Sequence, residues 1–223
     1  MILMTPDHST LPSELPKDAV CHMAYVPRTK RLLDVVLILL GLPLALPFVL
    51  SIAILQKLTS RGPVFFRQQR VGQNGRVFNM LKFRSMHVDA EARLAEIKQG
   101  SDREGICFKQ KHDPRVTILG RFLRRSSLDE LPQLWNVLRG EMSLVGPRPA
   151  LPQEVAEYPE AAMGRLAGLP GLTGLWQISG RADLDFDQMI ELDLLYLQNI
   201  SVATDLRILL GTFGAVFTGR GAY

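Results

Sequence analysis

The chain has 223 residues, of which 47% are hydrophobic and only 7% aromatic, an aliphatic content higher than a soluble domain needs. This composition excludes disordered and collagen-like proteins, and a total of 2 cysteines excludes a disulfide scaffold and favours a reducing, cytosol-facing location. The formal charge of +4 is unevenly spread: residues 61–140 carry 16 Lys and Arg against 8 Asp and Glu, whereas residues 141–223 carry 5 against 10. A basic middle is therefore followed by an acidic end.

Residues 1–28 contain prolines and no hydrophobic periodicity, which predicts a flexible cytosolic tail. Residues 29–60 are expected to form a membrane anchor, because the 21 residues 35–55 carry no charge. That is about the length a helix needs to cross ~30 Å of hydrocarbon. A buried helix of a soluble core would usually be shorter and amphipathic, and a signal peptide would start earlier and end in a small-residue cleavage site.

Two prolines, Pro43 and Pro47, lie near the middle of this apolar run. Each removes a backbone donor, which predicts a sharp bend. Both flanks are basic, with Arg28, Lys30 and Arg31 before the run and Lys57, Arg61, Arg67 and Arg70 after it. The positive-inside rule then draws both ends to the cytoplasm. We expect a monotopic, re-entrant anchor with a proline-broken helix, and a single transmembrane span is the alternative.

The remaining residues, 61–223, predict an α/β domain that is mainly helical and contains a small β-hairpin. Strand patterns over 62–71 and 76–84 are joined by a Gly/Asn turn. Helices are expected over 90–98, over 117–125, from Leu131 to a stop at Gly140, and over most of 184–217. The glycine-rich stretch 168–180 is expected to be a loop.

Two adjacent carboxylates, Asp129 and Glu130, follow Arg124 closely and form the sharpest candidate site. Carboxylates beside guanidinium groups can hold a divalent cation and a phosphate together, and one carboxylate can attack phosphorus. The alternative is structural, because Ser127 to Glu130 also fits a capping box at a helix start. Pro132 weakens that alternative, since proline fits poorly beyond the first turn of a helix.

Three other features could join this site. Lys82 and Arg84 lie at the end of the predicted hairpin. The alternative is that these charges only prevent an exposed strand edge from pairing with another chain. Prolines on both sides stiffen the backbone around Arg148, which suits bidentate recognition of a phosphate. The alternative is that this segment only ends a helix and begins a loop. Asp193 lies among leucines and could point inward, whereas the acids before it fit the polar start of a helix.

At these residues the chain resembles the bacterial sugar transferase family, the monotopic phosphoglycosyl transferases that begin polyprenol-linked glycan assembly. The resemblance runs from about residue 29 to the C-terminus. It rests on five stretches in the family's order, residues 30–34, 81–86, 127–136, 142–149 and 170–180. The overall pattern looks most like the short initiators of exopolysaccharide synthesis that lack extra N-terminal membrane helices.

The resemblance implies a cytosolic catalytic domain with membrane-associated helices on the cytoplasmic face of a bacterial inner membrane. It implies transfer of hexose 1-phosphate, from glucose or galactose, from a UDP-sugar donor to polyprenyl (undecaprenyl) phosphate, with Mg²⁺ as cofactor. Asp129 would attack the β-phosphorus, release UMP and carry a covalent phosphosugar until the polyprenyl phosphate removes it. Membrane lipids, a second copy of the chain and downstream glycosyltransferases are the further partners expected.

The resemblance also assigns roles to individual positions. It implies catalytic roles for Asp129, Glu130, Arg124 and Lys82, substrate contacts for Arg148, Arg84 and Pro147, magnesium binding by Asp129, Glu130 and Asp193, and a membrane bend at Pro47 with Pro43. One departure is Leu46, where many relatives have serine before the proline, so the hydrogen bonding at the bend differs.

Two other classes of protein compete with the enzyme. An inactive membrane scaffold or regulator of a polysaccharide assembly complex would keep the fold, but it would have no need of an intact dyad with its surrounding cations. The basic middle, residues 61–140, also suggests a nucleic-acid-binding protein. The membrane segment and the lack of aromatic residues interleaved with basic ones argue against it.

Overall fold

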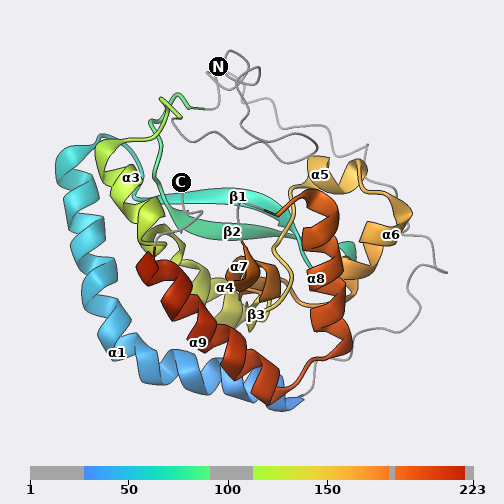
Figure 1. Ribbon diagram of the computed structural model, residues 1–223. Helices are drawn as coiled ribbons and strands as arrows, with labels where there is room; N and C mark the ends of the chain where they lie inside the picture. Colours follow the sequence, from blue (N-terminus) through green and yellow to red (C-terminus); the bar gives the residue numbers. More distant parts are fainter. Residues whose placement is uncertain (1–27, 91–112, 181–183, 219–223) are drawn as a thin grey trace.

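The computed structural model describes residues 28–90, 113–180 and 184–218, and Figure 1 draws their helices and strands. The expected tail and most of the expected helix over 90–98 lie outside this part. The described residues are mostly helical and contain two sheets of two strands each. The predicted mixed fold, in which helix predominates, is confirmed.

A β-hairpin forms the larger sheet. Strand β1 (Phe65–Val71) pairs antiparallel with β2 (Val77–Phe83), with the first residue of β1 opposite the last of β2. The connection is a short 3-10 turn, η2 (Gln73–Gly75), in which Asn74 and Gly75 have φ angles of 54° and 77°. Asparagine and glycine tolerate this left-handed region better than other residues, so the turn chemistry fixes the hairpin as predicted.

Short helices carry most of the remaining described chain. In chain order they are α3 (Ile118–Arg125), α4 (Gln133–Arg139), α5 (Pro152–Ala156), α6 (Glu160–Met163), α7 (Leu175–Ser179), α8 (Phe186–Gln198) and α9 (Val202–Thr218), with the 3-10 turns η4 (Leu128–Glu130) and η5 (Gly164–Ala167). The predictions over 117–125, up to Gly140 and over 184–217 are confirmed by α3, α4 and the pair α8 and α9. Gly140 ends α4 with a φ angle of 78°.

A second, parallel sheet pairs β3 (Ser143–Val145) with β4 (Gly171–Thr173). Strand β4 and helix α7 both lie inside the glycine-rich stretch 168–180, so the expectation of a loop is wrong for these two elements. Each strand has only 3 residues, too few for an alternating pattern to appear in the sequence. The glycine at position 171 is needed for close approach, because a Cβ there would lie 2.1 Å from the backbone nitrogen of Gly146.

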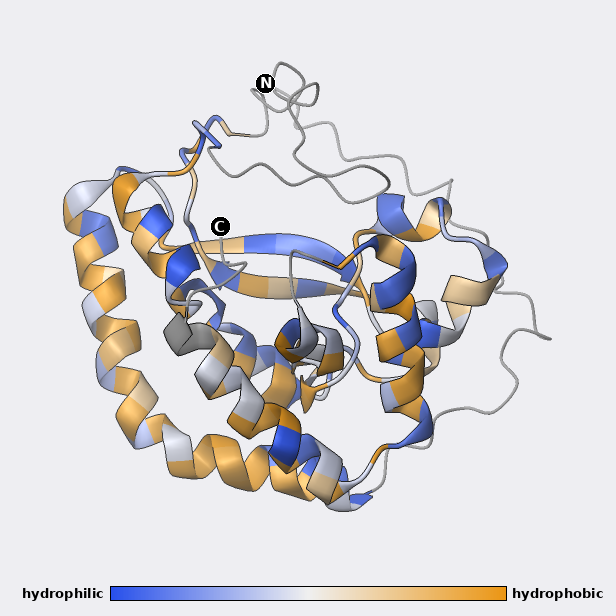
Figure 2. Ribbon diagram, viewed as in Figure 1, coloured by the Kyte–Doolittle hydropathy of each residue, from blue (hydrophilic) through white to orange (hydrophobic). Residues whose placement is uncertain are grey.

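Helix α1 (Arg28–Thr59) corresponds to the expected anchor. It is 32 residues long and remains helical through Pro43 and Pro47. Figure 1 shows that it turns a corner part-way along its length, giving one arm near α9 and one near α3. By length and composition α1 could cross a membrane, and little of its most apolar stretch is buried in the protein. Hydrophobic residues occupy most positions along both arms (Figure 2).

The first turns of α1 are fastened to the domain by charged side chains. Lys30 forms a buried ion pair with Asp205 of α9, with 2.6 Å between nitrogen and oxygen. Asp34 accepts a hydrogen bond of 2.8 Å from the hydroxyl of Ser143 in β3. Arg31 donates to two main-chain carbonyls at the end of α4, where a helix carries partial negative charge. Two of the basic residues expected only to flank the membrane are therefore used inside the domain.

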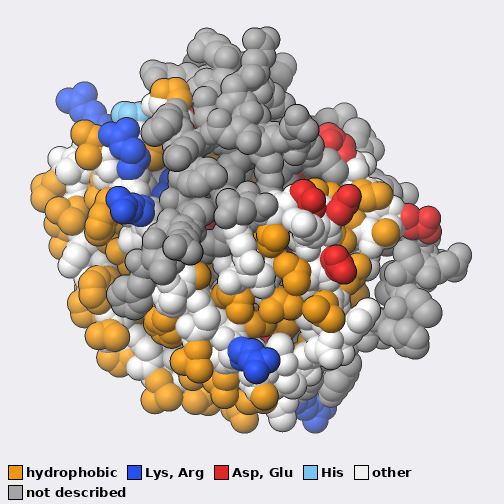
Figure 3. Space-filling view, viewed as in Figure 1, with side chains coloured by type: hydrophobic (Ala, Val, Ile, Leu, Met, Phe, Trp, Pro, Cys, Tyr) orange, Lys and Arg blue, Asp and Glu red, His pale blue; other side chains and the backbone are white. Residues whose placement is uncertain are grey.

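The last turns of α1 contact the hairpin and α3. Ile52 is buried against Phe83 of β2 and Leu123 of α3. The side-chain amide of Gln56 donates a hydrogen bond of 2.5 Å to the main-chain carbonyl of Arg84. Both ends of α1 are thus held by one domain, while hydrophobic side chains cover much of the surface along α1 and α9 (Figure 3).

Candidate active site

The acidic dyad Asp129–Glu130 lies on the 3-10 turn η4 between α3 and α4. Ser127, just before the turn, has a φ angle of 55°, a conformation that few residues with a side chain adopt. Its hydroxyl makes no capping hydrogen bond, so the capping-box alternative is wrong. Pro132 instead forms the N-cap of α4, at a helix start where its missing N–H does no harm.

Asn136 holds α4, and with it the dyad, against the edge of the hairpin. Its side-chain nitrogen donates to the carbonyl of Asn79 (2.8 Å), and its side-chain oxygen accepts from the N–H of Leu81 (3.0 Å). The amide therefore pairs with β2 much as a neighbouring strand would. This contact brings Lys82, the next residue of β2, to the dyad. Asn136 lies in the stretch 127–136 of the family resemblance, but no sequence pattern predicts its contact with β2.

Lys82 and Glu130 form an ion pair with 2.7 Å between Nζ and Oε1. Their side chains keep 24% and 31% of their surface exposed, so the pair can be reached by a ligand. Burial opposes the ionisation of Glu130, but the charge and hydrogen bond of Lys82 hold its pKa below the usual range. The charges of Arg148 and Arg70 act in the same direction. Glu130 is therefore a fixed negative charge at neutral pH.

Asp129 differs from its neighbour. It is only 7% exposed, and within the described part of the chain no side chain hydrogen-bonds its carboxylate. Burial raises the pKa of Asp129 to about 6, although the charges of Lys82 and Arg124 work against this rise. The negative charge of Glu130 adds to the rise. The result is a carboxylate that is ionised at neutral pH but weakly stabilised, which is the condition of a reactive oxygen nucleophile.

Arg124, on the last turn of α3, is the second cation beside the dyad. Its Nε donates a hydrogen bond of 2.9 Å to the hydroxyl of Ser85. Burial lowers the pKa of Arg124, and the charge of Asp129 raises it. A guanidinium nevertheless stays protonated in proteins. Ser85, which orients this guanidinium, was not singled out from the sequence.

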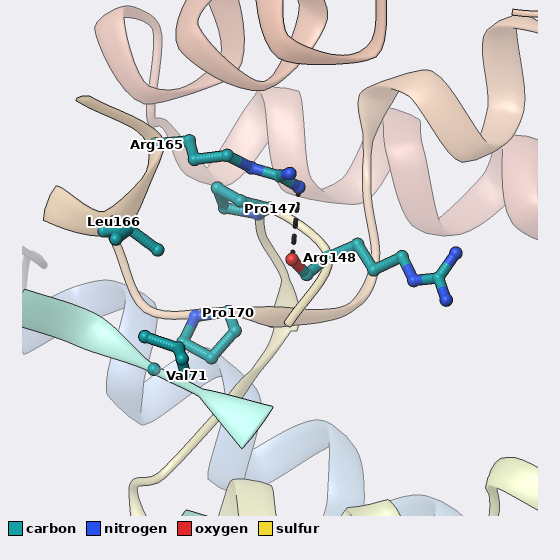
Figure 4. A pocket seen from close by; sticks show the side chains of 8 residues that line it. Val71, Pro147, Arg148, Arg165, Leu166 and Pro170 are labelled. Carbon is teal, nitrogen blue, oxygen red and sulfur yellow. Dashed lines mark hydrogen bonds between the residues drawn. The ribbon is translucent and has the colours of Figure 1, made fainter. Parts of the chain in front are cut away.

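Arg148 approaches from the segment after β3. Its side chain is exposed and points away from the small pocket that Pro147 and Pro170 line, while its main-chain carbonyl faces Arg165 (Figure 4). Among the described residues its guanidinium has no hydrogen bond or ion pair. Its charge lowers the pKa of both Glu130 and Asp193, so it lies within electrostatic reach of both. Arg148 therefore lies near enough to Glu130 of the predicted dyad for their charges to interact.

Asp193 is placed differently from the other predicted acids. It is 1% exposed and pairs with Arg165 at 2.5 Å between Oδ2 and the guanidinium. Burial raises its pKa to about 6, although Arg165 opposes that rise. In the part of the chain that the structure describes, no three His, Cys, Asp or Glu side chains gather as metal ligands would. The partner of Asp193 is Arg165, which no local sequence pattern distinguishes from a surface arginine.

Arg84 hydrogen-bonds to the end of α1 rather than to the dyad. Its guanidinium donates to the carbonyl of Arg61 (2.8 Å) and to the hydroxyl of Ser60 (3.0 Å), both at the end of α1. Only 7% of its surface is exposed. These contacts hold the connection between α1 and the hairpin. A substrate contact by Arg84 stays a prediction.

The site therefore combines two carboxylates of different character with three cations. Lys82, Arg124 and Arg148 come from β2, α3 and the segment after β3. Cations beside carboxylates suit a phosphate or diphosphate, and the partly exposed acid Glu130 can share a divalent cation with such a ligand. The buried acid Asp129 has no side-chain hydrogen bond among the described residues and lies within the field of Lys82 and Arg124. Phosphoryl transfer is the chemistry that fits this arrangement.

Comparison with known proteins gives one family and several close relatives. A family model described as bacterial sugar transferase matches residues 25–219. A protein named galactosyl transferase CpsE from Streptococcus agalactiae is 44% identical over 86% of this chain, which spans 43% of that relative. The exopolysaccharide production protein ExoY of Sinorhizobium fredii is 42% identical, with 87% of this chain and 88% of that protein covered.

A third relative has a more explicit name. A UDP-glucose:undecaprenyl-phosphate glucose-1-phosphate transferase from Klebsiella pneumoniae is 42% identical over 87% of this chain. The chain spans 41% of its length. The chain therefore matches nearly the full length of some relatives and less than half of others.

Proposed function

The chain belongs to the bacterial sugar transferase family, and we propose that it is a phosphoglycosyl transferase of exopolysaccharide synthesis. In this proposal a hexose 1-phosphate, from glucose or galactose, passes from a UDP-sugar to undecaprenyl phosphate, and UMP is released. The relatives support both the donor and the acceptor, since one is named for galactosyl transfer and another for UDP-glucose and undecaprenyl phosphate.

The observation that carries the proposal is the state of Asp129. A structural acid of this fold would be paired with a cation through hydrogen bonds, as Asp193 is. Asp129 has no such bond among the described residues, and burial raises its pKa to about 6. It also lies within the field of Lys82 and Arg124, which can bind the anionic group that it attacks.

The proposed reaction has two displacements at one phosphorus atom. An Asp129 carboxylate oxygen bonds to the β-phosphorus of the UDP-sugar, and the bond from that phosphorus to the bridging oxygen breaks. The bridging oxygen leaves with UMP, and the enzyme carries an acyl phosphosugar. A phosphate oxygen of undecaprenyl phosphate then attacks the same phosphorus, which restores the carboxylate and forms undecaprenyl diphosphosugar.

The cations supply most of the remaining catalysis. Phosphoryl transfer needs positioning and charge neutralisation more than covalent chemistry from the protein. Lys82 is held by Glu130 and Arg124 by Ser85, so both present fixed positive charge beside Asp129. Arg148, whose guanidinium is exposed, is proposed to bind the phosphates of the donor.

Magnesium fits this site as a cofactor held by Asp129 and Glu130. Mg²⁺ is usually bound by one or two carboxylates together with substrate phosphates and water, so two acids suffice. The weakly stabilised charge of Asp129 is the feature of this structure that a cation would satisfy. Bound Mg²⁺ would neutralise charge on the diphosphate. Asp193 is not assigned to the ion, because two acids suffice and its Oδ2 atom binds the almost fully buried guanidinium of Arg165.

A re-entrant anchor at the cytoplasmic face of the membrane is proposed for α1. Its support is that Lys30 near the start of the helix and Gln56 near the end both bind the same domain. A straight crossing would place the two ends on opposite sides of the bilayer. Cysteines at the exposed positions 28 and 61 should therefore react with impermeant probes only from the cytoplasmic side, and labelling of one from outside would establish a span.

The proposed function is tested by UMP release from a panel of UDP-sugars. Membranes or detergent-purified full-length protein should release UMP from UDP-glucose or UDP-galactose when undecaprenyl phosphate and Mg²⁺ are present, and EDTA should stop the release. The panel also identifies the donor sugar. Absence of UMP from every UDP-sugar, with a folded protein, would favour the inactive scaffold instead.

A further inference from the structure

Arg148 lies in the segment 147–150, whose backbone is held through its carbonyl groups. Four successive main-chain carbonyls each accept a hydrogen bond from another part of the chain. The bonds are Gly171 N–H to Pro147 (2.8 Å), Arg165 to Arg148 (3.1 Å), Arg70 to Pro149 (3.0 Å) and Val71 N–H to Ala150 (2.8 Å). Prolines at positions 147 and 149 have no N–H to donate, so the carbonyls are the groups by which this segment can be held.

Two of the four donors are buried guanidinium groups. Arg165 and Arg70 are only 6% and 5% exposed. Burying a charge is unfavourable unless it is paired, and each of these has a carboxylate partner. Asp193 lies 2.5 Å from Arg165, and Glu154 lies 3.9 Å from Arg70.

Two similar chains of contacts therefore reach the segment. In each, a buried carboxylate faces an arginine, and the arginine donates to a carbonyl next to or within Arg148. Arg165 is further fixed by the hydroxyl of Tyr158, which accepts a hydrogen bond of 2.8 Å from it. The side chain of Arg148 itself is exposed, so its direction depends on the backbone that carries it (Figure 4).

We propose that Arg165 and Arg70 are positioning residues that hold Arg148 for the phosphates of the sugar-nucleotide donor. Asp193 then acts through Arg165 rather than as a ligand of magnesium. The inference rests on the proposed function, because Arg148 is taken to bind the donor. It adds two arginines and a role for Asp193 that the sequence did not indicate.

The kinetic test is a double-mutant cycle on UMP release. Arg165→Lys keeps the charge beside Asp193 but lacks the fork that reaches two partners at once. It should raise the KM for the UDP-sugar about tenfold, with kcat changed less than about threefold. In an Arg148→Ala background the same substitution should change KM less than about twofold, because the side chain through which Arg165 affects donor binding is absent. An equal effect in both backgrounds would overturn the proposal.

A second measurement does not depend on activity. Hydrogen–deuterium exchange of the full-length protein should be faster over residues 146–151 in Arg165→Lys and in Arg70→Lys, while α3 and α4 exchange as in the wild type. Arg67→Lys, an exposed arginine on the same strand as Arg70, is the matched control and should leave this exchange unchanged. Unchanged exchange over 146–151 in both arginine variants would show that Arg165 and Arg70 do not hold this backbone. That result would refute the proposal even if no UDP-sugar proved to be a substrate.

A variant that fails to fold is recognised by its melting curve, and Asp193→Asn then replaces it. This change removes the charge behind Arg165 and leaves every group of the dyad in place. It should raise the KM for the donor and leave the Mg²⁺ concentration for half-maximal rate unchanged within about twofold. A large rise in the Mg²⁺ requirement would make Asp193 a metal ligand and contradict the inference.

Discussion

Asp129 and Asp193 are two buried aspartates with similar acidity and different surroundings. Burial raises the pKa of each to about 6. Asp193 accepts a short hydrogen bond from Arg165, whereas Asp129 has no side-chain partner among the described residues and lies beside a second carboxylate. A raised pKa therefore marks a reactive group only when the geometry leaves that group free to react.

The two regions also differ in what surrounds them. Around Asp129 the ion pair of Lys82 and Glu130 is partly exposed, so a substrate can reach it. Around Asp193 the partner is almost fully buried, so the pair supports backbone rather than ligand. Asp129 is therefore arranged to react with a substrate, and Asp193 is arranged to hold Arg165 against the backbone.

The largest difference between the two acids should appear in turnover. Asp129→Asn removes the proposed nucleophile and should lower kcat for UMP release by about 1,000-fold or more. Asp193→Asn should leave kcat within about threefold of wild type, because it acts on donor binding. Steady-state rates over a range of UDP-sugar concentrations measure both. Equal losses of kcat in the two variants would erase the distinction.

A smaller effect should appear in the pH profile. Asp129 must be ionised to attack, so kcat/KM for the donor should fall about tenfold per unit as the pH drops below about 6. Asp193 has a similar pKa, so the wild-type profile does not assign the acidic limb. The Asp193→Asn variant should show the same fall in kcat/KM at acidic pH. If the fall disappeared in that variant, the group whose protonation causes it would be Asp193 and not Asp129.

The smallest effect concerns magnesium. Glu130→Gln removes one of the two proposed ligands and should raise the Mg²⁺ concentration for half-maximal rate about tenfold. Glu160→Gln, a change at an exposed acid on α6, is a control that should not alter the requirement. Rates measured over a magnesium titration give the comparison. An unchanged requirement in Glu130→Gln would remove the dyad as the magnesium site.

The sequence predicted the parts that depend on neighbours along the chain. The hairpin follows from the turn at Asn74 and Gly75, and α4 follows from its apolar spacing and its stop at Gly140. The dyad could be found because its two acids are adjacent and arginines precede them. These features need no knowledge of long-range contacts.

The parts that the sequence missed depend on contacts between distant residues. Arg165 lies 28 positions from Asp193, and nothing local distinguishes it from a surface arginine. Asn136 reaches Asn79 across 57 positions to hold the dyad against the hairpin. The parallel strands are short, and they form because glycines at 146 and 171 let two backbones touch. Such roles are set by packing rather than by pattern.

The central claim is that Asp129 carries the sugar phosphate, and the most direct measurement is the mass of the enzyme after reaction with donor alone. The protein is mixed with the UDP-sugar that supports turnover and with Mg²⁺, without undecaprenyl phosphate, quenched rapidly and digested. A phosphohexose adduct is expected on the peptide that contains Asp129, together with release of UMP up to one equivalent, and Asp129→Asn should show neither. An adduct on another residue, or UMP formed only when the acceptor is present and with no adduct, would contradict the claim.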